Sequence, residues 1–180
     1  MTLLLANARL VDPEGREGPG ALVIRDGLIA DIAWGQAPEP PEGAELVDCG
    51  GHCLAPGIVD LGVKIGEPGE RHKESFRTGG RAAAAGGVTT MVTRPDTDPA
   101  IDTPEALDFV TRKAREIAPV RVLPMAALTR GREGREMTEI GLLRDAGAVA
   151  FTDVDRPVTD TRLFQRALAY AGGLGALVIH

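Results

Sequence analysis

The strongest constraint on this chain is the regular alternation of short apolar runs with longer helical stretches from Pro56 to His180. Five apolar runs predict strands: Ile58–Val63, Val88–Thr93, Val120–Met125, Ala148–Phe151 and Ala176–Ile179. The stretches between them predict four helices: Lys73–Ala85, Pro104–Ile117, Thr138–Asp145 and Thr161–Ala171. Strands that alternate with helices form a parallel sheet, because each crossover needs a connection of helix length.

The length of this region limits which parallel fold it can form. Only 125 residues run from Pro56 to His180, whereas a complete (β/α)8 barrel needs about 250 residues. The region is therefore either a complete open α/β sheet or just over half of a barrel.

The first 55 residues have a different pattern, with short apolar runs and turn residues. Asp26-Gly27 lies between two such runs, and this dipeptide is a strong hairpin signal because a type I′ turn needs positive φ at both central residues. A Pro-rich loop, Gly35–Gly43, and another short strand, Glu45–Asp48, follow. We expect two domains: a small β-sandwich over residues 1–55 and a βα region over residues 56–180.

Several classes of protein are excluded by composition. The formal net charge of −6 disfavours a nucleic-acid binder, which needs a cationic surface. No stretch of 18 apolar residues is present, so we expect no membrane span, and Met1–Asp12 lacks the features of a signal peptide. We therefore expect a cytoplasmic protein. Cys49, His52 and Cys53 supply only three of the four ligands of a usual zinc site, and we interpret this cluster as structural.

Two segments resemble the cyclic amidohydrolases, and within them dihydroorotase of the long bacterial type. The family has a P-G-x-[IV]-D-x-H-x-H-x-R-x-P-G block at the end of the first barrel strand, which Pro56–Gly69 resembles. A T-G-x-x-A-A-A-A-G-G-[FV]-T-T block and a P-N-T-x-P block correspond to Thr78–Thr90 and Pro95–Pro99. The run Pro68–Glu74 is also similar to dihydroorotase. The resemblance covers essentially the whole chain and implies the first five strands of an amidohydrolase-type (β/α)8 barrel, apparently truncated.

The resemblance also implies a chemistry. Family members hold zinc at the carboxyl ends of barrel strands, where the metal lowers the pKa of a bound water and polarises a ring carbonyl. An aspartate late in the barrel relays the proton, while an Arg and an Asn bind the substrate carboxylate. The reaction is the reversible cyclisation of carbamoyl-aspartate to dihydroorotate in pyrimidine synthesis.

This sequence departs from the family pattern at the functional positions. The two metal-ligand histidines fall on Gly62 and Lys64, and the substrate-binding Arg and Asn fall on Gly66 and Asp96. Scaffold residues match the pattern nearby: Asp60, Pro68, Gly69, Gly86, Gly87, Pro95 and Pro99. Selective loss of the functional residues indicates a chain kept for its fold rather than its chemistry.

Two ligand positions are retained according to the resemblance. Asp153 corresponds to a ligand after the fourth strand, and His180 to the histidine after the fifth. A stable zinc site normally needs at least three protein ligands, so we expect no cofactor. We also expect Lys64 to pair with Asp153 near the centre of the former metal site, because a buried unpaired carboxylate is costly. The late-barrel catalytic aspartate lies outside this chain.

Other charged residues receive structural interpretations. His72, Lys73 and Glu74 are predicted to open the first barrel helix, where a carboxylate near the N-terminus is favourable. Arg130, Arg132 and Arg135 alternate with acidic residues in a loop, and we expect them to be solvated.

The resemblance leaves three functions open. The leading hypothesis is a noncatalytic dihydroorotase-like protein of pyrimidine biosynthesis that serves as a structural partner of aspartate carbamoyltransferase. The alternative is an active metal-dependent cyclic amidohydrolase of dihydroorotase, hydantoinase or allantoinase type, which would need zinc. The third is a non-functional fragment with open sheet edges, prone to aggregation unless another chain completes the barrel. We expect an oligomer, with no nucleic-acid or membrane partner.

Overall fold

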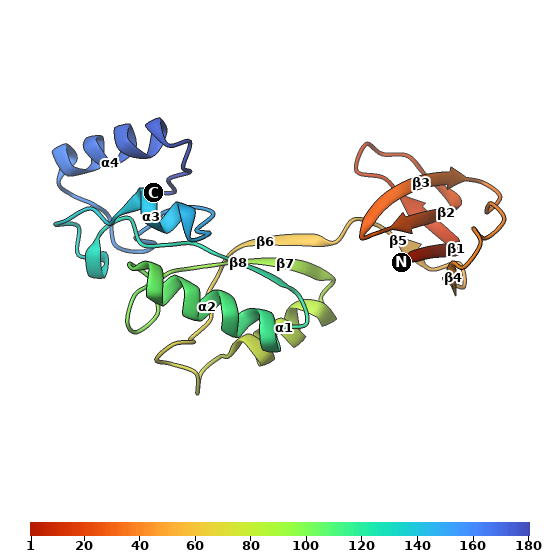
Figure 1. The fold of residues 1–180 in the computed structure, drawn as a ribbon, viewed down its shortest axis with the longest axis horizontal. Coiled ribbons are helices and arrows are strands. Elements are labelled where there is room, and N and C mark those ends of the chain that lie inside the picture. The colour runs from red at the N-terminus through yellow and green to blue at the C-terminus, as the bar shows by residue number, and fades with distance from the viewer. The chain divides into compact units, whose positions relative to one another are not determined.

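The computed structural model describes all residues 1–180, which divide into two compact units, Met1–Pro56 and Gly57–His180. Figure 1 shows strands only in the first unit and both strands and helices in the second. None of the helices is both long and apolar enough to cross a lipid bilayer.

The first unit is one mixed β-sheet. Its strands are β1 (Thr2–Val11), β2 (Glu17–Arg25), β3 (Leu28–Trp34), β4 (Glu45–Asp48) and β5 (Cys53–Leu54). The order is β3-β2-β1-β4, with β5 also paired to β1. Asp26 and Gly27 join β2 to β3 with φ of 52° and 80°. The predicted hairpin is therefore confirmed, because both turn residues have the positive φ that a type I′ turn needs.

The expected β-sandwich is wrong for these residues, because a sandwich needs two packed sheets and this unit supplies one. Its core is small and consists of Leu4, Ala21 and Val23. Ile29 and Ile32 on β3 remain exposed. The sheet therefore leaves apolar side chains that a second layer would cover.

The second unit is built on a parallel sheet with the order β6-β7-β8. The strands are β6 (Ile58–Val63), β7 (Val88–Thr93) and β8 (Arg121–Pro124). Parallel bridges from Ala126 to Phe151 and from Phe151 to Val178 continue the sheet. The predicted fourth and fifth strands thus lie in the expected places, but each is reduced to isolated bridges.

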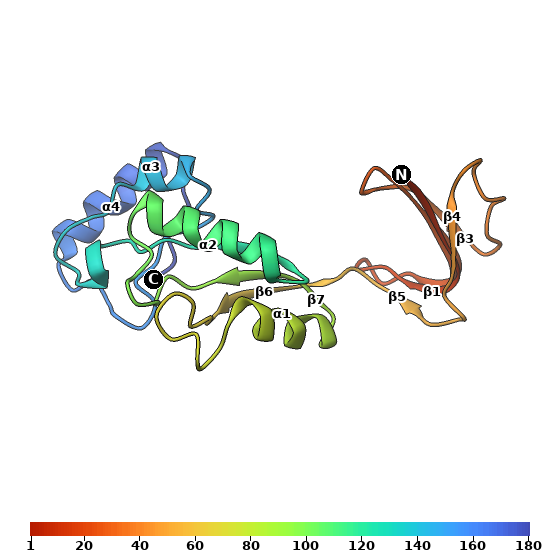
Figure 2. The same cartoon turned by 60° about the horizontal axis from the view of Figure 1, so that its bottom comes forward.

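The helices of this unit are α1 (Phe76–Ala85), α2 (Pro104–Ile117), α3 (Ile140–Asp145) and α4 (Thr161–Gly173), with a short 3-10 helix, η1, at Arg130–Arg132. Figure 2 shows α1 and α2 lying alongside the strands. Thr103 caps α2 by accepting from the amide of Ala106, and Pro104 takes the first helical position. Both features agree with the residue preferences of a helix start.

The prediction that His72, Lys73 and Glu74 open the first helix is wrong. They lie in the preceding turn, because Ser75 is the N-cap of α1 and accepts from the amide of Thr78. Lys73 instead forms an ion pair with Glu70, and Glu74 accepts a hydrogen bond from the Thr78 hydroxyl.

The two faces of the parallel sheet differ in how well they are covered. The main core lies between the sheet and the helices and includes Phe76, Leu107, Ile140, Phe151 and Leu163. A smaller cluster of Val92, Met125 and Ala150 packs with Leu123. Because the smaller cluster is separate from the helix-side core, we assign it to the opposite face of the sheet.

Candidate functional site

The candidate site lies at the carboxyl ends of the parallel strands. Lys64 follows β6, Asp96 follows β7, and Asp153 and His180 follow the two runs that continue the sheet by bridges. Functional residues of parallel α/β folds gather at this edge because all strands end there.

Asp96 is the centre of an ion network with Lys64 and Arg94. Its side chain is 5% exposed, and Arg94 binds it through both oxygens, with Nε at 3.1 Å from Oδ1 and Nη2 at 2.7 Å from Oδ2. Lys64 Nζ lies 3.2 Å from Asp96 Oδ2. We call these three residues the Asp96 network. Two cations therefore hold one buried carboxylate, a charge-assisted arrangement with a paired guanidinium fork.

The expected ion pair between Lys64 and Asp153 is wrong, because Lys64 pairs with Asp96. The topology gives the reason: β6 and β7 are neighbours, whereas β7 and β8 both lie between β6 and the run that leads to Asp153. Asp153 is 4% exposed and is satisfied by other groups. Its carboxylate accepts from the amides of Leu128 and Thr129, both at 3.0 Å, and from the Thr129 hydroxyl.

His180 lines a small pocket at the same edge together with Asp153. Its Nε2 atom accepts from the amide of Val158 at 3.3 Å. Its ring centroid lies 4.4 Å from that of Phe164. The imidazole thus packs on α4 with one nitrogen engaged by the main chain.

Arg132 is a buried residue that the sequence placed in a solvated loop, and that expectation is wrong. It is 8% exposed, and its Nε and Nη2 donate to the carbonyl of Asp153 at 3.2 and 3.0 Å. It also forms an ion pair with Asp155. The main partner of Arg132 is a backbone carbonyl, which every residue has and which therefore leaves no pattern in the sequence. No local signal thus distinguishes Arg132 from Arg130 and Arg135.

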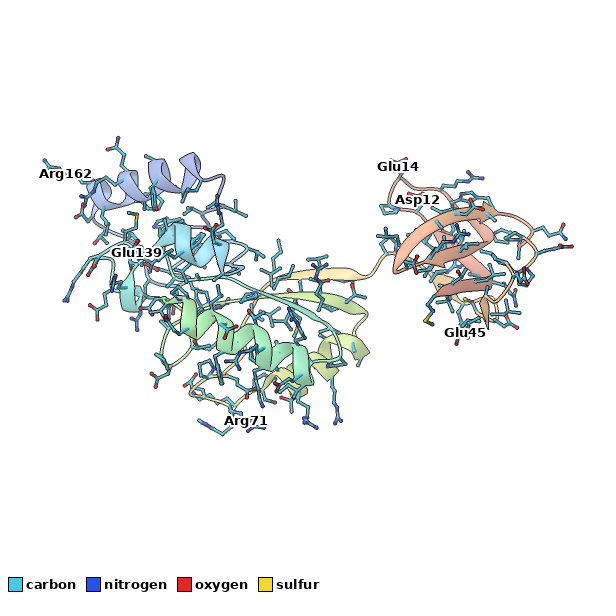
Figure 3. The ribbon with its side chains drawn as sticks, viewed as in Figure 1. Asp12, Glu14, Glu45, Arg71, Glu139 and Arg162 are labelled. Carbon is cyan, nitrogen blue, oxygen red and sulfur yellow. The ribbon has the colours of Figure 1, made fainter.

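Glu67 is a second buried charge that sequence reasoning missed. It is 4% exposed and accepts from the amide of Phe76 at 3.2 Å, which ties the loop after β6 to the start of α1. Arg71 Nε lies 3.6 Å from its Oε1, and Figure 3 shows Arg71 at the surface of this loop. A carboxylate at a helix N-terminus is favourable, so Glu67 positions α1.

A sequence profile of the family described as Dihydro-orotase-like matches residues 51–180. The chain belongs to the dihydroorotase-like family. It is 41% identical over 177 residues to a dihydroorotase from Sulfurihydrogenibium sp. (strain YO3AOP1), covering 98% of this chain and 41% of that protein. It is 38% identical over 180 residues to a dihydroorotase from Geobacter sp. (strain M21), covering 99% of this chain and 42% of that protein. The chain thus spans about two fifths of the length of these relatives.

Solved structures support the same fold. L-hydantoinase (dihydropyrimidinase) from Arthrobacter aurescens superposes with a TM-score of 0.79 at 22% identity, covering 98% of this chain and 39% of that one. A D-hydantoinase superposes with a TM-score of 0.74 at 25% identity, covering 99% and 39%. The mixed α/β fold that the family resemblance implied is therefore confirmed over the length of this chain.

The side chains at the strand ends do not fit the zinc that the family resemblance implies. Gly62 has no ligand atom, and its φ of 87° strains any other residue there. The Lys64 ammonium repels a dication and is engaged by Asp96. No group of three or more His, Cys, Asp or Glu side chains in residues 1–180 is arranged to hold a metal. We therefore derive no metal-dependent step for this chain.

The family's substrate-binding arginine is also excluded at Gly66 by the local backbone. A Cβ atom on Gly66 would lie 2.5 Å from the carbonyl oxygen of Glu70. Glu70 donates its amide to the Gly66 carbonyl at 2.6 Å, which closes this turn. A side chain at position 66 therefore requires the turn to open.

The cysteine cluster in the first unit makes an ordinary surface contact. Arg9 Nη2 donates to Cys53 Sγ at 2.6 Å and pairs with Glu17. Both cysteines have free thiols.

Proposed function

We propose that this chain belongs to a noncatalytic dihydroorotase-like protein that acts as a structural partner of aspartate carbamoyltransferase in pyrimidine biosynthesis. The Asp96 network carries the proposal. In the family resemblance, Asp96 stands where an Asn binds the substrate carboxylate, and here a buried carboxylate is held by Arg94 and Lys64. The charged side chains at these positions therefore pair with one another. This pairing favours a protein that keeps the family fold without the family reaction.

The uncovered face of the parallel sheet supports a partner that completes the barrel. Leu61 pairs in register with Val92 and so shares its face, yet Leu61 is 72% exposed and Val92 is buried. At the other end of the sheet, Leu177 is 59% exposed. β6 has a strand neighbour on one side only. Free edges and exposed apolar side chains favour pairing with further strands.

Two partners are compatible with this surface. One is the transcarbamoylase, and the other is a barrel-completing chain or segment, either of which gives an oligomer or a longer assembly. The relatives are more than twice as long as this chain, so the activity and partners of the whole protein are part of the proposal.

The alternative is an active metal-dependent amidohydrolase with altered ligands. The retention of both Asp153 and His180 at strand ends favours it. It requires zinc at near-stoichiometric level and hydrolysis of a cyclic amide such as dihydroorotate or a hydantoin.

The test is metal analysis, ring-hydrolysis assay and mass measurement on the purified full-length protein, alone and mixed with the transcarbamoylase. We expect negligible zinc, no hydrolysis and a complex of higher mass than either component. Near-stoichiometric zinc with measurable hydrolysis would establish the alternative. Two separate species in the mixture would overturn the proposed partnership.

A further inference from the structure

Asp153 makes more buried hydrogen bonds than any other carboxylate at the strand ends. Its Oδ1 accepts from the amides of Leu128 and Thr129 at 3.0 Å, and its Oδ2 accepts from the Thr129 hydroxyl. Both oxygens are thus committed to donors from one segment. Removing the carboxylate would be costly, because each buried donor would then have neither its acceptor nor a water molecule to replace it.

The main chain of Asp153 is tied to the same segment. Arg132 donates twice to its carbonyl oxygen, at 3.2 and 3.0 Å. The Thr129 hydroxyl oxygen also accepts from the amide of Gly134 at 2.9 Å. These bonds connect Asp153 to residues 128–134, which we call the 128–134 turn.

Strained backbone lies on both sides of this connection. Arg132 has φ of 58° and Val154 has φ of 60°, a left-handed region that is unusual for a β-branched residue. Such conformations persist only where the surrounding contacts determine them. The bonds of Asp153 are the contacts that link the two strained positions.

We propose that Asp153 is a positioning residue that anchors the 128–134 turn, and that it is not a metal ligand in this chain. This inference rests on one part of the proposed function, that the protein works without zinc. It does not depend on which partner the protein binds. The position that the family uses for chemistry has here become a hydrogen-bonded support for the loop between β8 and α3.

The variants Asp153→Asn and Asp153→Ala distinguish an anchor from a ligand. The Asn side-chain oxygen can still accept from the Leu128 and Thr129 amides, and its NH2 group can donate to the Thr129 hydroxyl oxygen. We therefore expect Asn to retain most of the stability. Ala leaves three buried donors unpaired, and we expect its melting temperature to fall by roughly 5–10 °C.

Hydrogen exchange supplies a local measurement. The amides of Leu128, Thr129 and Gly134 should exchange faster in Asp153→Ala and stay protected in Asp153→Asn, because exchange follows local opening. If Asp153→Ala does not fold, Thr129→Val replaces it: the Gly134 amide should then exchange faster while the Leu128 amide stays protected. Equal protection of these amides in every variant would overturn the anchor role.

Metal analysis after dialysis against zinc separates this inference from the proposed function. We expect the same negligible zinc content in the wild type, Asp153→Asn and Asp153→Ala. Stoichiometric zinc in the wild type that both variants lose would overturn the inference, because it would make Asp153 a ligand. Stoichiometric zinc that both variants keep would overturn the metal-free function and leave the anchor role standing.

Discussion

At the residue scale, the Asp96 network joins three charged side chains at the ends of β6 and β7 by mutual pairing. Asp96 is buried, whereas the side chain of Lys64 is 52% exposed. Arg94 is less exposed than Lys64 and makes two hydrogen bonds to the carboxylate. We infer that Arg94 contributes more to the free energy of unfolding than Lys64 does. A bidentate, partly buried ion pair is weakened less by solvent screening than an exposed one.

Replacing Arg94 by Met should lower the free energy of unfolding by about 2–3 kcal/mol, since it leaves a buried carboxylate with one solvent-screened partner. Arg112→Met is the matched control, because Arg112 forms an exposed ion pair with Asp108 at 2.8 Å and should cost about 0.5 kcal/mol or less. Urea unfolding of the three proteins measures both values. Equal losses in the two variants would contradict a special role for Arg94.

Placing histidines at positions 62 and 64 should not create a zinc site. In the double variant Gly62→His/Lys64→His, Asp96 loses one cation, and position 62 keeps a backbone with φ of 87° that disfavours a side chain by about 1 kcal/mol or more. We expect lower stability and negligible zinc, measured by thermal unfolding and metal analysis. A stoichiometric, tightly bound metal would show that the strand ends rearrange freely.

The ion pair between Lys73 and Glu70, before α1, predicts that the stability of the protein depends on pH in the acidic range. The hydrogen bond from Lys73 lowers the pKa of Glu70 below its ordinary value, with the charge of Lys73 acting in the same direction. A carboxyl whose pKa is lowered by folding stabilises the protein above its unfolded pKa, near 4.3. That contribution is lost as pH falls through the lower folded pKa.

Glu70→Gln should therefore flatten the fall of melting temperature between about pH 5 and pH 3. Glu42→Gln is a suitable control, because Glu42 is an exposed carboxylate in the loop before β4. Thermal unfolding over this pH range tests the prediction, and identical pH profiles for wild type and Glu70→Gln would refute it.

At the scale of elements, the alternation of apolar and helical segments predicts the βα region well. The bounds of β6, β7 and α2 equal the predicted ranges, because apolar periodicity and the Thr103-Pro104 start are local properties. The start of α1 was predicted three residues early, since three polar residues before Ser75 have no apolar periodicity to mark the boundary. The last two strands are only bridges, because pairing depends on neighbours along the sheet and not on the strand alone.

The exposed apolar side chains at the sheet edges predict a surface-specific effect. Leu177→Glu should weaken assembly with the proposed partner, because it places a charge on an apolar face. Leu142→Glu is the control, since Leu142 on α3 is also 59% exposed but belongs to a helix. Mass measurement of the mixtures reads out assembly. Equal weakening by both substitutions would argue against the sheet face as the contact surface.

At the scale of the whole molecule, both units leave apolar sheet surface uncovered. The first unit is a single sheet with exposed Ile29 and Ile32, and the second exposes Leu61 and Leu177. Burial of such surface stabilises by about 25 cal/mol per Å². Each unit therefore exposes apolar sheet surface whose burial would add to stability.

The sequence by itself determined the family and the parallel βα order, because motifs and periodicity are written along the chain, and it predicts which functional residues are replaced. It also determined that Gly62 cannot hold a metal, since glycine has no ligand atom. Only the tertiary structure decided that Lys64 pairs with Asp96, that Arg132 is buried and that Asp153 is held by the 128–134 turn. Partners of a charged group come from segments far apart in sequence, and no local pattern specifies which of several strand-end carboxylates lies within reach.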